Sequence, residues 1–119
     1  VMVDEGKIVA AAIMNQIQDE DYKHVIWKHE ARDNEVMVLH ALAVDPLEKN
    51  KGYGKAFVLF YEEYAKHHGC IELRMDTNMI NIRAQKMYQK FGFEERGIIE
   101  GIFNGIPNIQ LVCFEKYLI

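Results

Sequence analysis

The stretch 38-VLHALAVDPLEKNKGYGKAFVLFYEEYAKHHG-69 decides how this chain folds. An apolar run ends at Asp45-Pro46, and a lysine-rich segment carrying Gly52 and Gly54 then leads directly into a long amphipathic segment. Apolar side chains recur in that segment at helical spacing, and a glycine closes it. The stretch therefore predicts a strand, a glycine-containing loop and a helix, in that order.

The two glycines indicate an anion-binding loop. The first turn of a helix has free backbone N–H groups and a partial positive charge, and glycine lets a phosphate approach them closely. Amide hydrogen bonds to a charged acceptor contribute about 1.5–3 kcal/mol each, so three or four are enough to hold a pyrophosphate. The spacing matches neither a P-loop nor the dinucleotide fingerprint. A glycine-rich turn flanked by solvated lysines is the alternative that these residues leave open.

The composition is that of one ordinary globular domain over residues 1–119. Half of the chain is hydrophobic and 27% is charged, and the net charge of -4 argues against a nucleic-acid partner, which needs a broad basic face. The apolar runs are shorter than a membrane span. Cys70 and Cys113 lack the spacing of a metal site or a disulfide framework. We therefore predict reduced thiols, a cytoplasmic protein, no membrane contact and no metal.

The remaining segments predict a mixed α/β or α+β fold. A polar loop with one short turn near residues 19–22 is expected over residues 17–35, and a turn-rich connection over "GIFNGIPN". The elements expected around these loops are a hairpin turning at residues 4–6, a strand at 36–44, a helix at 52–68, a strand at 71–75, a helix at 81–91, and strands at 93–99 and 109–118.

Two blocks of the sequence resemble the GNAT superfamily of acyl-CoA-dependent N-acyltransferases. The block "LAVDPLEKNKGYGKAF" is similar to the family's Gln/Arg-x-x-Gly-x-Gly/Ala loop, with Lys49 where glutamine or arginine is usual. This replacement keeps the positive charge but loses the planar fork of arginine. The block "LRMDTNMINIRAQKMYQKFGF" is similar to a second family pattern, Asn-x-x-Ala-x-x-x-Tyr-x-x-x-Gly-Phe, through Asn81, Ala84, Tyr88, Gly92 and Phe93.

The resemblance implies a mixed, mostly antiparallel sheet with two main helices. It also implies that the family's first strand and two helices are missing, so these residues form the cofactor-binding part of a longer protein. Acetyl-CoA is the expected cosubstrate: backbone near the end of the strand would pair with its pantetheine arm, the glycine loop would hold its pyrophosphate, and Asn81 would lie near the arm. The cofactor-binding residues implied in this way are Leu42, Ala43, Val44, Lys49, Asn50, Lys51, Gly52, Tyr53, Gly54, Lys55, Asn81 and Tyr88.

The reaction implied by the resemblance needs two proton transfers. Tyr88 would donate to the leaving thiolate of CoA, and a base would take a proton from the attacking amine. His40 is the best candidate for the base, since "HALAV" resembles the arylalkylamine N-acetyltransferases, although Val38 stands where their first histidine would lie. A purely structural His40 is the alternative, and the rival bases are Asp76, water and the loop residues His29, Glu30 and Glu35.

The function predicted from the sequence is transfer of an acetyl group from acetyl-CoA to a primary amine. The acceptor would be a small molecule or an exposed amino group. A homodimer is a further expected partner, because a truncated sheet exposes an edge that a second copy could cover. A non-catalytic acyl-CoA-binding or regulatory module on the same fold is the alternative. The glycine loop belongs to both, so only turnover separates them.

Overall fold

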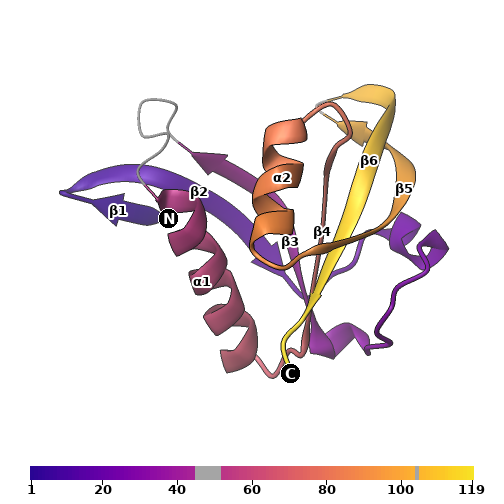
Figure 1. The fold of residues 1–119 in the computed structure, drawn as a ribbon, viewed down its shortest axis with the longest axis horizontal. Coiled ribbons are helices and arrows are strands. Elements are labelled where there is room, and N and C mark those ends of the chain that lie inside the picture. Colours follow the sequence, from indigo (N-terminus) through magenta and orange to yellow (C-terminus); the bar gives the residue numbers. More distant parts are fainter. Residues whose placement is uncertain (45–51, 104) are drawn as a thin grey trace.

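The computed structural model describes residues 1–44, 52–103 and 105–119. The described residues form a six-stranded sheet with two helices on one face (Figure 1). Two short 3-10 helices lie in the connection between the second and third strands of the chain. The described elements follow one another as β1 (Met2–Asp4), β2 (Lys7–Asn15), η1 (Glu20–His24), η2 (Asp33–Glu35), β3 (Val36–Val44), α1 (Tyr53–His67), β4 (Glu72–Asn78), α2 (Ile82–Lys90), β5 (Glu94–Phe103) and β6 (Ile106–Tyr117).

The strand order is β1-β2-β3-β4-β6-β5, and β3 and β4 form the parallel pair among otherwise antiparallel neighbours. A parallel pair needs a crossover connection, and α1 supplies it between β3 and β4. The mixed, mostly antiparallel sheet with two main helices, predicted above, is therefore confirmed.

Both faces of the sheet are covered, and β3 shows how. Met37 and Leu39 belong to the core cluster beneath α1 and α2, whereas Val36 and Val38 belong to a second cluster with Tyr22. Alternating side chains of a strand point to opposite faces, so the segment between β2 and β3 covers the face that the helices leave open. The short turn expected near residues 19–22 is the 3-10 helix η1, and it is followed by a second one, η2.

The helices begin and end close to where the sequence places them. Gly52 precedes α1 with a left-handed φ of 80°, which glycine adopts without steric cost. Phe57, Val58, Tyr61 and Ala65 form the buried stripe of α1. The helical spacing of the sequence runs through Tyr53, Phe57, Phe60 and Tyr64, but only Phe57 belongs to this stripe, and Phe60 is 53% exposed. None of the described helices combines the length and apolar character needed to cross a membrane.

The closing hairpin differs from the prediction. The turn-rich connection expected over residues 101–108 is largely strand, because β5 continues to Phe103 and β6 begins at Ile106. Gly101 pairs with Ile109, and a Cβ there would lie 2.8 Å from Leu111 Cδ1. This glycine therefore allows close packing within the sheet rather than a turn.

The strand predicted at residues 71–75 is also longer than expected. β4 continues through Asp76, Thr77 and Asn78, which pair with residues of β6. These three polar residues are typical of a turn, but pairing with a long neighbouring strand keeps them extended.

Candidate active site

A cleft opens in the sheet where β3 and β4 separate. Their parallel pairing ends at Leu39 and Met75. Beyond that point β3 stays paired with β2 up to Val44, and β4 stays paired with β6 up to Asn78. Within the described residues, no strand pairs with the β4-facing edge of β3 past Leu39, so its backbone polar groups face the cleft.

A bulge lies at the same point of β3. The register with β2 passes from Leu39 opposite Met14 to Ala41 opposite Ile13, so His40 has no paired residue. An extra residue of this kind bends a strand and redirects a side chain, and bulges are frequent beside active sites. His40 thus lies at the mouth of the cleft because of the strand geometry.

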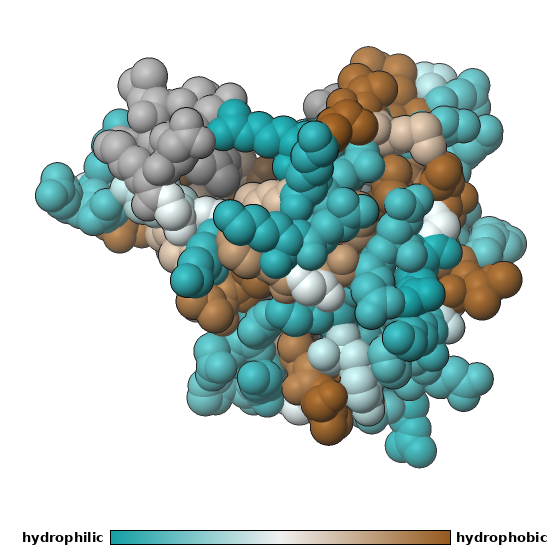
Figure 2. All heavy atoms as spheres, viewed as in Figure 1, coloured by the Kyte–Doolittle hydropathy of each residue, from teal (hydrophilic) through white to brown (hydrophobic). Residues whose placement is uncertain are grey.

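The cleft has a volume of about 1270 Å³ and lies between the ends of the central strands and the two helices. The face drawn in Figure 2 has hydrophilic side chains over much of α2. Predicted site residues that line the cleft are His40, Leu42, Gly52, Tyr53, Gly54, Lys55, Asn81 and Tyr88. Lys49, Asn50 and Lys51 lie outside the described residues.

The charges that line the cleft differ between its two sides. The helices contribute basic side chains, namely Lys55 from α1 and Arg83, Lys86 and Lys90 from α2. The other side contributes the carboxylates of Asp19 and Asp76. A ligand that is anionic at one end and cationic at the other complements this arrangement.

The first turn of α1 lines the cleft and carries no acidic residue of its own. Its cap residue Gly52 makes no side-chain hydrogen bond. The backbone N–H groups and the dipole of the helix are therefore available to a phosphate. Tyr53 donates a hydrogen bond of 2.6 Å to Asp4 Oδ2, which ties the start of α1 to the first hairpin.

Gly54 has a packing role that the sequence did not indicate. A Cβ at this position would lie 2.7 Å from the Met87 sulfur of α2. The glycine therefore permits the close approach of the two helices on the basic side of the cleft.

Leu42 and Ala43 lie on β3 beyond its last pairing with β4. They pair with Ala12 and Ala11 of β2 on the other side. Val44 pairs with Ala10 in the same way. No described strand pairs with the other edge of this part of β3, and its pairing with a pantetheine arm stays a prediction.

Asn81 has a structural function at the start of α2. Its Oδ1 accepts a hydrogen bond of 3.1 Å from the Ala84 N–H and so caps the helix. The asparagine of the second block thus explains where α2 begins. Its contact with the cofactor stays a prediction.

Tyr88 reaches the cleft from the buried face of α2. It is 5% exposed and packs edge-on against Phe93, with ring centroids 5.6 Å apart. Burial raises the pKa of Tyr88 to about 12, so the hydroxyl stays protonated at physiological pH. Among the described residues its hydroxyl has no hydrogen-bond partner, which leaves it able to donate to a bound group.

His40 is exposed, and its orientation is fixed by Asn15 of β2. Asn15 Oδ1 accepts from the Ile17 N–H at 3.0 Å and lies 2.6 Å from His40 Nε2. Because an amide oxygen can only accept, Nε2 carries the hydrogen in this pair. Nδ1 is then the nitrogen that can accept a proton.

Asp76 is the second candidate for the general base in the cleft. Burial raises the pKa of Asp76, and the hydrogen bond of 2.6 Å from Tyr22 Oη to its Oδ2 opposes this effect. Nearby Asp19 also raises the pKa of Asp76, while His40 lowers it. Asp76 and His40 therefore interact electrostatically across the cleft.

The structure separates the loop alternatives from the cleft. His29, Glu30 and Glu35 do not line it. Glu35 instead accepts from the Arg32 N–H at 3.0 Å in the turn η2. Tyr22 was missed by the sequence reasoning, because the sequence of a polar loop gives no signal that its single tyrosine is buried and donates to Asp76.

Sequence comparison identifies the family. The profile described as the acetyltransferase (GNAT) family matches residues 1–93, most of the chain. The chain belongs to this family. An uncharacterized N-acetyltransferase of Methanocaldococcus jannaschii is 31% identical over 83 residues, covering 70% of this GNAT chain and 37% of the relative. Human N-acetyltransferase 8B is 32% identical over 66 residues, covering 56% and 29%. The GNAT chain thus spans 29–37% of the length of these two curated relatives.

Solved structures agree with the GNAT fold. A Bacillus subtilis acetyltransferase in complex with CoA superposes with a TM-score of 0.72 at 20% identity, over 98% of this chain and 74% of that one. A ribosomal-protein-alanine N-acetyltransferase from Brucella melitensis gives a TM-score of 0.73 at 19% identity, over 99% and 67%. The predicted resemblance to the GNAT family, including its fold, is confirmed.

Proposed function

We propose that this chain is the cofactor-binding part of an N-acetyltransferase that transfers an acetyl group from acetyl-CoA to a primary amine. The observation that carries the proposal is the cleft itself. Among the described residues, it joins a helix N-terminus without a side-chain cap, a strand edge with no pairing strand and a pair of carboxylates in one cavity. Each of the three matches one part of the reacting pair.

The cofactor would enter from the basic side. Its pyrophosphate would accept hydrogen bonds from the first turn of α1 at Gly52 and Gly54, and the lysines and arginine nearby favour its charge. Its pantetheine arm would lie along the free edge of β3 at Leu42 and Ala43, as an added strand does. The thioester would then lie deep in the cleft, beside the Tyr88 hydroxyl.

The amine would enter from the acidic side. An amine with an ordinary pKa of about 10.4 arrives as a cation at pH 7, because its deprotonation there costs about 4.6 kcal/mol. Asp76 and Asp19 would attract that cation, and His40 Nδ1 would accept its proton. The neutral amine then attacks the thioester carbon, with both reactants held in one cavity.

The negative charge formed in the reaction needs two donors. A backbone N–H on the free edge of β3 would hold the oxyanion of the tetrahedral intermediate. The Tyr88 hydroxyl would donate to the sulfur as the thiolate leaves. Donors held in advance by a strand and a helix would need little reorganisation in the transition state.

The acceptor class is proposed no more finely than a primary amine. The names of structural neighbours range from a ribosomal-protein-alanine N-acetyltransferase to a nourseothricin acetyltransferase, so a shared fold does not choose between a protein and a small molecule. The carboxylates of the cleft favour a cationic acceptor of either kind.

The test measures binding and turnover separately in the full-length protein. Isothermal titration with CoA and acetyl-CoA reports binding, and release of free thiol with a panel of small amines and peptides reports turnover. Saturable binding with amine-dependent thiol release is expected. Binding without release across the panel would favour the non-catalytic module, and no binding of CoA would refute the cofactor site.

A further inference from the structure

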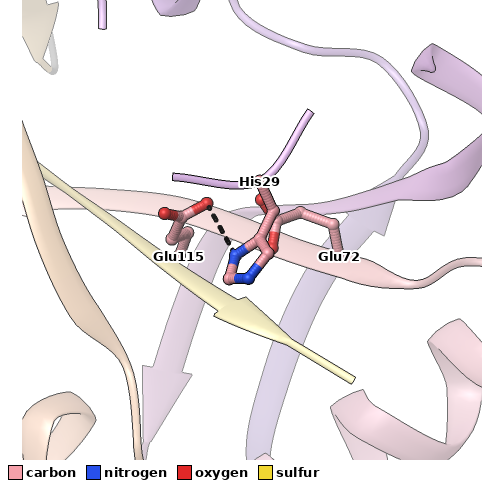
Figure 3. A group of neighbouring side chains, drawn as sticks. All are labelled: His29, Glu72 and Glu115. Atoms are coloured by element: carbon pink, nitrogen blue, oxygen red, sulfur yellow. Dashed lines mark ion pairs between the residues drawn. The ribbon is translucent and has the colours of Figure 1, made fainter. Parts of the chain in front are cut away.

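A second cluster of reactive side chains lies apart from the cleft. His29 comes from the segment between η1 and η2, Glu72 from the start of β4 and Glu115 from the end of β6, and their side chains point toward one another (Figure 3). None of the three lines the proposed active site. Both carboxylates are buried, with Glu72 0% and Glu115 2% exposed.

Each buried carboxylate has one oxygen engaged and one available. Glu72 Oε2 lies 3.3 Å from Arg74 Nε. Glu115 Oε1 accepts from the Lys28 N–H at 2.7 Å and pairs with Arg96 Nε at 2.8 Å. The other two oxygens, Glu72 Oε1 and Glu115 Oε2, are buried and have no hydrogen-bond partner among the described residues.

The histidine contributes a third available atom. His29 Nδ1 is buried and has no hydrogen-bond partner in the described parts of the chain, and it lies 4.0 Å from Glu115 Oε2. The ring is stacked on Tyr117, with centroids 4.1 Å apart and planes 7° from parallel. This stacking fixes the ring, while the 31% exposure of the side chain leaves a path from solvent.

We propose that His29, Glu72 and Glu115 bind one divalent transition-metal ion of the zinc type. One ligand atom from each residue lies within 4.8 Å of the other two. Zinc–ligand bonds of about 2.0–2.2 Å bring ligand atoms to roughly 3.5 Å from one another, so small side-chain movements complete the site. One imidazole and two carboxylates suit zinc and its neighbours better than magnesium or calcium, which prefer oxygen alone.

The surrounding groups resemble the outer shell of a metal site. Arg74 and Arg96 each hold the carboxylate oxygen that the ion would not use, which orients the other oxygen. Arg74 also donates to the His29 carbonyl oxygen at 2.8 Å, so the histidine's backbone is held from the same group. The ion would tie the covering segment to β4 and β6, and its role is therefore stabilisation of this face of the sheet.

A proton is the competing occupant of the same space. Burial, followed by the neighbouring Glu115, raises the pKa of Glu72 to about 9, so without a cation the two carboxyl groups share one proton. Arg74 and Arg96 already balance the two ionised carboxylates, so a metal ion would be held by its bonds to the three ligand atoms and not by excess negative charge. Lys28 and Glu94 are 3.8 Å apart, half-exposed, and nearly cancel each other.

The distinguishing variant is Glu72→Gln, because an amide has the shape of a protonated carboxyl group but is a poor ligand. Chelator-treated full-length protein is titrated with Zn²⁺ in a calorimeter, and with Co²⁺ while its visible absorption is followed. The wild type is expected to bind one equivalent of each, with absorption bands of protein-bound Co²⁺ and a raised Tm. Glu72→Gln and His29→Gln should both lose this binding.

A matched control removes an exposed histidine elsewhere. His67→Gln, in the last turn of α1, should bind Zn²⁺ as the wild type does. Circular dichroism checks that each variant folds, and His29→Gln alone decides the matter if Glu72→Gln does not fold. The proposal is overturned if the wild type binds no stoichiometric ion, in which case the site holds a proton only, or if both ligand variants bind as well as the wild type.

Discussion

Tyr88→Phe is the most informative change in the proposed active site, because it removes one oxygen and little else. The ring packs against Phe93 and Phe114, and the phenylalanine keeps both contacts. Since the hydroxyl has no partner among the described residues, its removal leaves no orphaned group behind. The Tm should therefore stay the same or rise slightly.

The pKa of Tyr88 limits how much its hydroxyl contributes to catalysis. Full proton transfer from a phenol of pKa about 12 to a thiolate whose acid has a pKa near 8.5 is uphill by roughly 4.8 kcal/mol. Donation of a hydrogen bond to the developing thiolate has no such cost. One preorganised donor to developing charge contributes about 2.7–4 kcal/mol. Turnover of Tyr88→Phe should therefore fall by about 10²–10³-fold, toward the lower end of the range for a lost general acid.

The assay is single-turnover acetyl transfer, in which chemistry limits the rate, together with titration of CoA. The affinity for CoA should hardly change, because the hydroxyl acts only as charge develops on sulfur. Tyr64→Phe is the matched control, since Tyr64 lies on α1 and does not line the cleft. A Tyr88→Phe protein with the wild-type rate of transfer would refute the assignment and leave water as the donor.

Three further substitutions test the rest of the cleft. Gly54→Val should weaken CoA binding in a calorimetric titration and lower the Tm, because its side chain would overlap the Met87 sulfur at a cost of about 1–3 kcal/mol; unchanged affinity would exclude the phosphate loop. His40→Ala should abolish the acid limb of the pH–rate profile, whereas a structural His40 would lower the Tm and leave that profile unchanged. Asp76→Asn keeps an acceptor for Tyr22. Because burial raises the pKa of Asp76 in the folded state, the stability of the wild type falls as pH rises through that pKa. The Tm of the variant should therefore rise relative to the Tm of the wild type as the pH increases. A constant difference from pH 4 to pH 7 would contradict this reasoning.

The two helices and the strands beside them were predictable because their signals are local. Glycine at 52, 69 and 92 has positive φ at the helix boundaries, and Asn81 caps α2 through a residue three positions later. Such short-range geometry is specified by neighbours in the sequence. The glycine loop and Tyr88 could be named as candidate site residues for the same reason, since each belongs to a compact sequence block.

The closing hairpin could not be predicted because its outcome depends on a distant partner. Gly101 and the residues around it have the composition of a turn, yet their backbone pairs with β6. Propensity in strands is weak compared with pairing and packing against a neighbour. The same reason explains why Asp76 and Asn78, which resemble turn residues, lie in β4.

The metal ligands proposed here have no sequence signal at all. His29, Glu72 and Glu115 come from three separate elements, and none has a second ligand at the short spacing that marks a metal motif. Register brings two of them together: Glu72 pairs with Tyr117 and Arg74 with Glu115, so both glutamates point to one face of adjacent strands. Only the paired sheet places them within reach of one ion.

The polar face of β4 connects these observations. Glu72, Arg74 and Asp76 alternate with Leu73 and Met75, a pattern typical of a strand with one solvated face. Here that face is covered instead by the segment between β2 and β3, and a covered polar face needs a partner for each group.

The covering segment supplies those partners from one end of β4 to the other. Tyr22 donates to Asp76 beside the cleft, and Gln18 and the His29 carbonyl accept from Arg74 in the middle. His29 then reaches the glutamates at the far end. Because one segment positions both the carboxylate of the cleft and the third ligand of the proposed metal site, an ion bound at His29 would hold in place the same segment whose Tyr22 orients Asp76. The two sites are separate in chemistry, but they share the structure that orders them.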